Sequence, residues 1–172
     1  GEAESQAMLG GIMLDTKNFV LKTGARTFEA SAFLKRCGAD TVQVTRLFAD
    51  SLETYKEKAQ LVSGAEILEN CAIAVSDWQD GDMRIAAAQA ADELLSLRGV
   101  KASFVIYRNG SDVNISARSL GDVNVQLILE EFGGGGHLTM AGAQIKDTTV
   151  KRINERLKKV IKEKIDTVTV KD

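Results

Sequence analysis

The sequence predicts an α/β fold in which helices flank a small mixed β-sheet. Three observations lead to this prediction. Strand-like apolar runs alternate with helical patterns through the second half of the chain, an Asn109-Gly110 turn signal joins two of these runs, and a long amphipathic pattern closes the sequence. Alternating strands and helices are typical of α/β domains, and Asn-Gly is a strong hairpin signal. A further strand and helices are predicted to precede this sheet.

The first part of the chain carries one predicted strand and two predicted helices. The apolar run over residues 11–14 reads as a short buried strand that ends at Asp15. A helix is expected from Thr27, which suits an N-cap, to a stop at Gly38. Apolar residues then recur at helical spacing over 41–62, and we expect one continuous helix there.

The domain boundary is predicted to be helical, because the chain contains no proline and therefore no proline-rich spacer. We place the junction in the helical pattern over 41–62. This gives a first part of residues 1–62 and a second domain of residues 63–172.

The second domain alternates strands and helices. We expect a buried strand over 70–78, an alanine-rich helix over 84–97, strands over 102–107 and 113–119, a short helix over 123–132, a closing strand over 141–145, and an amphipathic helix over 148–165. The last helix has one apolar stripe and many lysines and arginines. We read these cations as a solvated helix face, with nucleic-acid binding as the alternative.

Composition limits the class of protein. The 172 residues are 44% hydrophobic and 27% charged, as in ordinary globular domains, and the net charge of −2 argues against a broadly basic nucleic-acid-coating surface. Cys37 and Cys71 are predicted to be reduced thiols of a cytosolic protein. No apolar run approaches the ~18 residues that span a bilayer. The chain starts at Gly1 without a methionine, and we expect it to be a piece of a longer protein.

A run of four glycines over residues 133–136 precedes His137, the only histidine of the chain. Such a run is costly to order and is kept where the backbone turns sharply or lies close to a ligand. Exposed backbone N–H groups beside an imidazole suit an anionic oxygen, of which phosphate is the usual example. The alternative is a helix C-cap and turn, with His137 merely packed or exposed.

Two further segments carry candidate site residues. In a strand over 113–119, Asn114, Ser116 and Arg118 share one face, and an arginine beside a serine suits phosphate recognition. The alternative is the exposed face of an antiparallel strand. Asp15, at the end of a strand, suits a manganese or magnesium ligand. One aspartate cannot hold such an ion, so a turn or helix-cap role is the alternative.

These motifs together resemble one family. The string from Phe132 to Gly142 resembles the GGGH-x-x-A-A-G signature of the DHH phosphoesterase superfamily, which marks its DHH-associated substrate domain. The strand Ile115-Ser116-Ala117-Arg118-Ser119 fits the same domain. Residues 11–19 and 23–28 look like the last motif of the preceding DHH domain. The combination closely resembles the GdpP type, the membrane-bound cyclic-di-AMP phosphodiesterases, over nearly the whole chain.

The resemblance implies a role for each candidate residue. Asp15 is expected to be the last protein ligand of a two-manganese centre. Arg118 and Ser116 are expected to assist in holding the substrate phosphate, and the main phosphate contacts are expected from Gly134, Gly135, Gly136 and His137. The two metals would activate water, and the second domain would neutralise and orient the phosphate.

The resemblance also implies substrate and location. The full-length protein is expected to convert cyclic di-AMP to linear pApA, as a cytoplasmic domain of a protein anchored in the cell membrane. The expected partners are the cyclic or linear dinucleotide and an upstream DHH domain of the same protein, with no membrane contact by this part. Periodicity leaves open whether the long helices also form a homodimer.

Two departures from the family pattern affect the prediction. Met140 stands where the signature has a small alanine, and the His-x-x-x-Asp-x-Asp and Asp-His-His segments that supply the other metal ligands are absent. We therefore expect this chain to bind the nucleotide and not to hydrolyse it.

Two other functions compete with this prediction. One is a RecJ-like or oligoribonuclease-like phosphoesterase that acts on short single-stranded nucleic acid. The other is a non-catalytic RNA-binding module, similar to the C-terminal domain of alanyl-tRNA synthetases. An RNA module should show a basic face with aromatic residues for stacking, whereas this chain is only 5% aromatic and has a negative net charge. A small nucleotide therefore fits better.

Overall fold

The computed structural model describes residues 1–78 and 83–170, and the chain divides into two compact units, Gly1–Ser51 and Leu52–Asp172. Each unit has a hydrophobic core of its own. Within the described ranges, no helix combines the length and the apolar character that crossing a membrane requires.

The first unit is helical. It consists of α1 (Glu2–Asp15), α2 (Ala25–Arg36) and α3 (Thr41–Leu47). Its small core is formed by four buried residues, namely Leu9, Leu34, Ala39 and Val44. α2 begins after Gly24, and Thr27 acts from its third position by accepting a hydrogen bond from the Gly24 N–H at 3.2 Å.

The predicted strand over residues 11–14 is wrong. These residues form the end of α1, and Asp15 is the last residue of that helix. A short apolar run does not by itself distinguish a strand from a buried helix. Glu2 and Glu4 favour the helix, because carboxylates in the first turn interact favourably with the positive end of the helix dipole. Asp15 therefore ends a helix and not a strand.

The predicted continuous helix over 41–62 is two helices, α3 and α4 (Leu52–Ser63). Asp50 and Ser51 lie between them, and both residue types favour the position just before a helix. We predicted a domain boundary after residue 62, whereas the compact units divide after Ser51. The reason is that Leu61 of α4 is buried in the core that the second unit forms with its next helix.

The second unit is built on a six-stranded sheet with the order β1-β2-β3-β4-β6-β5. Its strands are β1 (Glu66–Leu68), β2 (Cys71–Ser76), β3 (Ala102–Asn109), β4 (Asp112–Ser119), β5 (Gly135–His137) and β6 (Met140–Ile145). β2 and β3 are parallel, and α5 (Arg84–Leu94) connects them; all other neighbours are antiparallel. The predicted α/β fold with a mixed sheet is confirmed.

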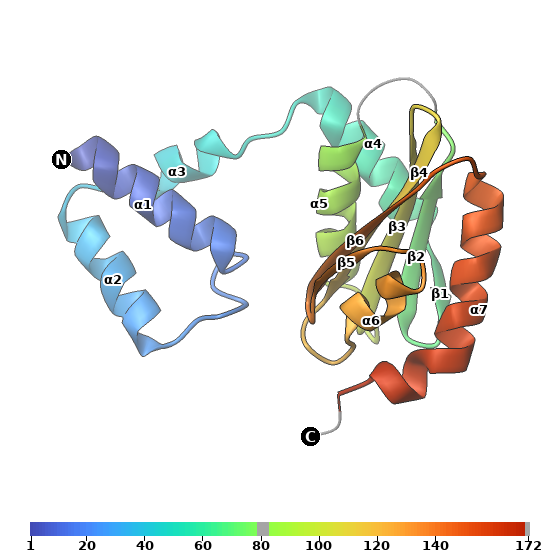
Figure 1. Ribbon diagram of the computed structural model, residues 1–172. Helices are drawn as coiled ribbons and strands as arrows, with labels where there is room; N and C mark the ends of the chain where they lie inside the picture. Colours follow the sequence, from blue (N-terminus) through green and yellow to red (C-terminus); the bar gives the residue numbers. More distant parts are fainter. Residues whose placement is uncertain (79–82, 171–172) are drawn as a thin grey trace. The chain divides into compact units, whose positions relative to one another are not determined.

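Helices cover both faces of this sheet. α4 and α5 pack on one face, and α6 (Val125–Glu130) and α7 (Val150–Val168) pack on the other (Figure 1). Neighbouring residues of β3 show the alternation: Phe104 is buried with α6 and α7, and Val105 is buried with α4 and α5. β3 is therefore buried on both of its faces.

The predicted hairpin between residues 107 and 113 is confirmed, with its turn shifted by one residue. Asn109 pairs with Asp112, so Gly110 and Ser111 form the loop, and Gly110 adopts the positive φ of +61° that glycine tolerates. β1 and β5 were not predicted. β5 consists of Gly135, Gly136 and His137, and glycine is depleted in strands, so its sequence carries no strand signal.

Candidate functional site

A groove of about 630 Å³ opens on the sheet face that α4 and α5 cover only in part. The core beneath these helices takes strand residues from β2 and β3 alone. Beyond them, β4 and β6 present polar or small residues and one methionine on the same face, because every second residue of a strand shares a face. These groove residues are Asn114, Ser116 and Arg118 of β4 and Met140, Gly142 and Gln144 of β6. The predicted common face of Asn114, Ser116 and Arg118 is confirmed.

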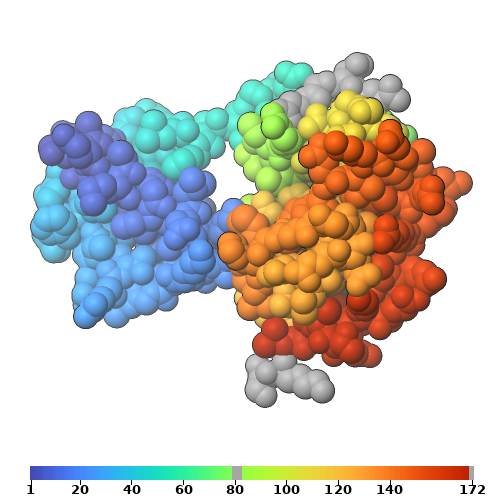
Figure 2. Space-filling view, in the orientation of Figure 1, coloured from blue at the N-terminus to red at the C-terminus, as the bar shows by residue number. Residues whose placement is uncertain are grey.

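Strand register aligns the glycine segment with the arginine of β4. Directly opposite residues point to the same face of a sheet. One row across three strands contains Arg118, Met140 and His137, and the next row contains Ser116, Gly142 and Gly135. Neighbouring strands lie roughly 4.8 Å apart, so the backbones of β4 and β5 are about 10 Å apart in each row. The segment that carries α6 and β5, orange in Figure 2, lies at the molecular surface.

Arg118 is held in place by contacts within the second unit. Its Nη1 donates to Ser116 Oγ at 3.2 Å and to the carbonyl oxygen of Ala117 at 2.9 Å. Its Nε lies 3.3 Å from Asp92 Oδ1 of α5. This Nε–H is buried and is not aligned for a hydrogen bond, so the Asp92 contact is an ion pair. The guanidinium side chain is only 11% exposed, and its Nη2 makes no contact with the described residues that would use its protons.

The structure gives different reasons for glycine at each of the four positions 133–136. Gly133 ends α6 with a φ of +72°, the left-handed conformation that favours glycine after a helix. A Cβ on Gly134 would lie 2.2 Å from the carbonyl oxygen of Gly142, and a Cβ on Gly136 would lie 2.3 Å from that of Met140. Gly135 has no left-handed φ, and nothing lies within 4 Å of where its Cβ would be. The fold therefore requires three of these glycines and leaves Gly135 unexplained.

His137 ends β5 with an exposed side chain that forms no hydrogen bond to the residues described. Its row partner Met140 lines the groove and is 43% exposed, whereas His137 itself does not line it. β5 is the edge strand of the sheet, so alternate backbone N–H groups point away from β6. The imidazole and these amides therefore lie at the edge of the sheet, next to Gly133, Gly134 and Gly135, which do line the groove.

The other end of the groove contains residues that the sequence reasoning missed. Tyr107 of β3 lies opposite Asn114, and Asn114 lies opposite Gln144 of β6. All three line the groove. Asn114 was recognised only as a neighbour of Ser116 and Arg118. Tyr107 could have been found from the hairpin signal, which fixes the register of β3 against β4. No sequence signal places Gln144, because its position depends on the pairing of β4 with β6.

Asp15 lies in the first unit, whereas the other six predicted site residues lie in the second. Its carboxylate is exposed and lies 3.8 Å from Lys22 Nζ. Over residues 1–78 and 83–170, no three His, Cys, Asp or Glu side chains gather where they could hold a metal ion. The described residues therefore do not by themselves fit a two-manganese centre, and the role of Asp15 as a metal ligand stays a prediction.

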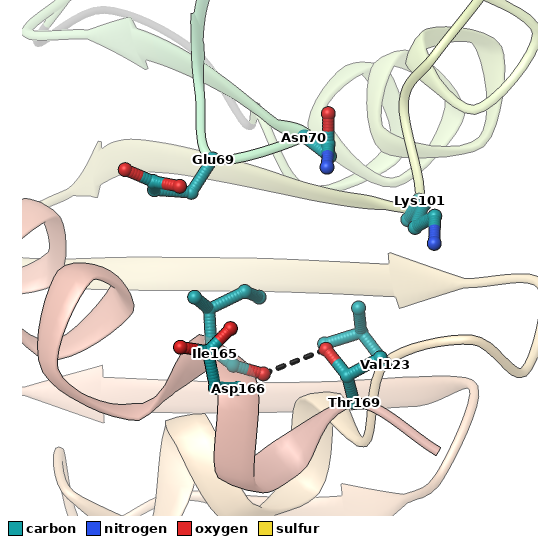
Figure 3. A pocket seen from close by; sticks show the side chains of 7 residues that line it. All are labelled: Glu69, Asn70, Lys101, Val123, Ile165, Asp166 and Thr169. Atoms are coloured by element: carbon teal, nitrogen blue, oxygen red, sulfur yellow. Dashed lines mark hydrogen bonds between the residues drawn. The ribbon is translucent and has the colours of Figure 1, made fainter. Parts of the chain in front are cut away.

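A second cavity, of about 450 Å³, lies where the β1–β2 turn approaches the end of α7 (Figure 3). Its charged lining consists of the carboxylates of Glu69 and Asp166 and the ammonium group of Lys101. Two carboxylates beside one cation disfavour an anion. The groove with Arg118 is therefore the better candidate for a phosphate site.

Comparison with known proteins supports the second unit as the location of the functional site. Residues 69–164 match the model of the DHHA1 domain family. The chain is 50% identical to the cyclic-di-AMP phosphodiesterase GdpP of Geobacillus thermodenitrificans over 92% of its own length and 24% of that protein. It is 45% identical to the cyclic-di-AMP phosphodiesterase PdeA of Listeria monocytogenes over 91% of its length and 24% of that protein. It thus spans about a quarter of these relatives.

A solved structure shares the fold. An exopolyphosphatase-related protein from Bacteroides fragilis superimposes with a TM-score of 0.82 at 18% identity, over 96% of this chain and 52% of that one. The family model covers strands β2 to β6, the glycine segment and most of α7. The chain belongs to the DHHA1 domain family, and over nearly its whole length it is similar to the GdpP and PdeA cyclic-di-AMP phosphodiesterases.

Proposed function

We propose that the groove of the second unit binds a phosphate of cyclic di-AMP or of linear pApA, and that the whole protein hydrolyses cyclic di-AMP to pApA. The observation that carries the proposal is the alignment of Arg118 and Ser116 on β4 with the glycine segment and His137 on β5. The similarity to GdpP and PdeA, both named as cyclic-di-AMP phosphodiesterases, supports the choice of substrate.

Each residue has a distinct part in this proposal. Arg118 uses Nη1 within the protein and offers Nη2 to a phosphate oxygen, which guanidinium groups bind well. Ser116 Oγ accepts from Arg118, so its own O–H remains available to donate to the phosphate. Backbone N–H groups of the edge strand and the His137 imidazole meet the anion from the opposite side. Gly135 lets the ligand approach the backbone without a Cβ between them.

We propose manganese as a cofactor of the longer protein only. The described residues hold no cluster of metal ligands, so any metal that Asp15 binds needs further ligands from outside the described residues. We therefore infer that the second unit positions and neutralises the substrate, and that hydrolysis requires the upstream DHH domain. The membrane anchor of the GdpP type would likewise belong to another part of that protein.

The surface of the first unit supports an upstream partner domain. Several of its large apolar side chains are exposed, among them Met8 at 62%, Phe28 at 55%, Phe33 at 57% and Leu47 at 68%. Met8 and Phe33 line one apolar hollow of this unit, and large exposed apolar surfaces are typical of contact sites. We propose that the DHH domain of the same protein covers them.

Calorimetric titration of this chain with cyclic di-AMP and pApA tests the binding proposal. We expect Arg118→Ala to weaken binding of both ligands at least tenfold, since a hydrogen bond to a charged group contributes about 1.5–3 kcal/mol. His137→Ala should weaken it in the same direction. The matched control is Arg152→Ala, which removes an exposed arginine of α7 far along the chain. Equal binding by all four proteins would contradict the site.

The same titration separates the competing functions. A short single-stranded oligonucleotide that binds more tightly than either dinucleotide would favour the RecJ-like function. A structured RNA that binds while both dinucleotides fail would favour the RNA-binding module. Tighter binding of cyclic di-AMP or pApA than of both nucleic acids supports the proposal.

A further inference from the structure

Asn114 is a nearly buried amide that the protein does not use. It is 8% exposed, lines the groove, and its side chain forms no hydrogen bond to any residue in the described part of the chain. The buried side-chain atoms that lack a partner lie at other described residues, so the Asn114 amide atoms reach the surface of the groove, where a ligand can replace water. The amide faces the groove, and its partner is therefore expected to be the occupant of the groove.

The side-chain amide of Gln144, the residue opposite Asn114 on β6, has its orientation fixed by a hydrogen bond to a carboxylate. Its Nε2 donates to Asp112 Oδ2 at 2.7 Å. An ionised carboxylate only accepts hydrogen bonds, so the NH₂ group of Gln144 must point to Asp112. The Oε1 atom of Gln144 is left as an acceptor. The groove therefore has an amide with a donor and an acceptor at Asn114, and a second acceptor beside it at Gln144.

The distance between the proposed phosphate position and the Asn114 amide fits the length of one nucleoside. Asn114 and Ser116 are two residues apart on the same face of β4, which separates them by roughly 7 Å along the strand. The phosphate end of the groove contains Arg118 and Ser116, and the amide end contains Asn114 and Gln144. A nucleotide with its phosphate at the first end places its base at the second.

We propose that Asn114 and Gln144 read the edge of the nucleotide base and select a base with an exocyclic amino group beside a ring nitrogen, as adenine has at C6. The Asn114 amide donates to the ring nitrogen and accepts one proton of the amino group, the pairing that asparagine commonly makes with adenine. Gln144 Oε1 accepts the other amino proton. This inference rests on the proposed function, because it takes the groove to be the nucleotide site.

Inosine supplies the discriminating ligand. It replaces the 6-amino group of adenosine by a carbonyl oxygen and leaves the ribose and phosphates unchanged. In pIpI, this oxygen faces Gln144 Oε1, and two acceptors cannot form a hydrogen bond. We expect the wild-type chain to bind pApA about tenfold or more tightly than pIpI, since a bidentate base contact is worth about 1–3 kcal/mol of discrimination.

Calorimetric titration of the wild-type chain and two Asn114 variants with both dinucleotides tests the proposal. Asn114→Leu removes both hydrogen-bonding groups at similar volume, and Asn114→Asp removes only the donor. Both variants should lose most of the preference for pApA, and Asn114→Leu should bind pIpI as wild type does. Unchanged pIpI binding reports that the groove and its phosphate end are intact. Gln126→Leu, a half-buried glutamine of α6 that contacts Glu130 and does not line the groove, is the matched control and should keep the preference.

Each outcome has a separate meaning. Equal binding of pApA and pIpI by the wild type would overturn the base-reading role and leave the proposed function standing. Equal binding of pGpG and pApA would overturn the selection of the 6-amino group. A preference for pApA that survives in both Asn114 variants would show that other residues read the base. Failure of the wild type to bind any dinucleotide would contradict the proposed function itself.

Discussion

Gly135 and Gly134 are adjacent residues for which the structure predicts opposite effects of the same substitution. A Cβ on Gly135 would meet open space, whereas one on Gly134 would lie 2.2 Å from a backbone carbonyl oxygen and 2.6 Å from Ala143 Cβ. Gly135→Ala should therefore leave the free energy of unfolding unchanged or raise it by up to about 1 kcal/mol. Gly134→Ala should lower it by about 1–3 kcal/mol or more, because β6 has to move.

Urea unfolding and nucleotide titration of the two glycine variants distinguish ligand contact from fold. If the ligand lies against the backbone at Gly135, Gly135→Ala weakens pApA binding without loss of stability. Retained affinity in a stable Gly135→Ala protein would mean that the ligand does not approach this backbone. The family resemblance treats Gly134, Gly135 and Gly136 alike, and only the geometry separates them.

Cys71 is the buried thiol of β2, and its titration gives a pH dependence. Burial raises the pKa of Cys71 from 9.0 to about 12, and the nearby Glu69 carboxylate adds to the effect. The folded chain thus holds this proton more tightly than the unfolded chain does. The stability linked to Cys71 is complete below about pH 9 and is lost as the pH rises towards 12.

Thermal unfolding at pH 8 and pH 10 checks this expectation, with Cys71→Ala as the control for other groups that titrate in the same range. The decline in melting temperature should be larger for the wild type than for the variant. A thiol reagent at pH 8 should label exposed Cys37 and should label Cys71 only after denaturation. An equal decline in both proteins would mean that Cys71 does not contribute.

At the scale of elements, α7 shows how an amphipathic pattern becomes structure. Leu157 and Ile161 are fully buried against the sheet, and the opposite side of the helix is exposed. Several of its cations contact acidic residues or carbonyl groups of the same unit: Lys158 pairs with Glu66, Lys164 pairs with Glu131, and Arg156 donates to the Glu131 carbonyl oxygen. These contacts support the reading of a solvated helix face over a nucleic-acid surface.

Leu157→Ala is expected to lower the free energy of unfolding by about 2–5 kcal/mol, because it leaves a cavity between α7 and the sheet. Lys162→Ala, on the exposed side of the same helix, should change it by no more than about 0.5 kcal/mol. Urea unfolding measures both. Similar losses in the two variants would contradict the packing described for α7.

The elements that the sequence predicted well are those with a long or regular pattern. The hairpin of β3 and β4, the helix α5 and the stripe of α7 all follow from periodicity or turn chemistry. The prediction of a strand at 11–14 was wrong because a short apolar run is also compatible with a helix. The break before α4 was not predicted, because the apolar spacing continues on both sides of it. β5 exists only through its pairing with β6.

The candidate site was predictable only where strand alternation determines it. Ser116 and Arg118 follow from the period of two residues along β4, and their common face was predicted. Asp92 comes from α5, and its ion pair with Arg118 depends on how a helix packs across a sheet, which no local pattern encodes. Gln144 depends in the same way on the pairing of β4 with β6.

At the scale of the whole molecule, the two units differ in how much of their surface they bury. The second unit closes large cores on both faces of its sheet, whereas the first has a core of four buried residues and exposes many apolar side chains. All groove residues belong to the second unit. Binding should therefore depend on the second unit, and catalysis should depend on what the first unit contacts in the longer protein.

The chain alone is accordingly expected to bind cyclic di-AMP and not to hydrolyse it when manganese is added, because its described residues hold no cluster of three metal-ligating groups. Chromatographic detection of pApA after incubation with manganese measures this. A longer protein that includes the upstream DHH domain should produce pApA, and Asp15→Ala in that protein should abolish the activity while cyclic di-AMP still binds. Arg118→Ala should instead weaken binding and turnover together, since it removes a substrate contact. Manganese-dependent production of pApA by the chain alone would contradict the division of roles between the two units.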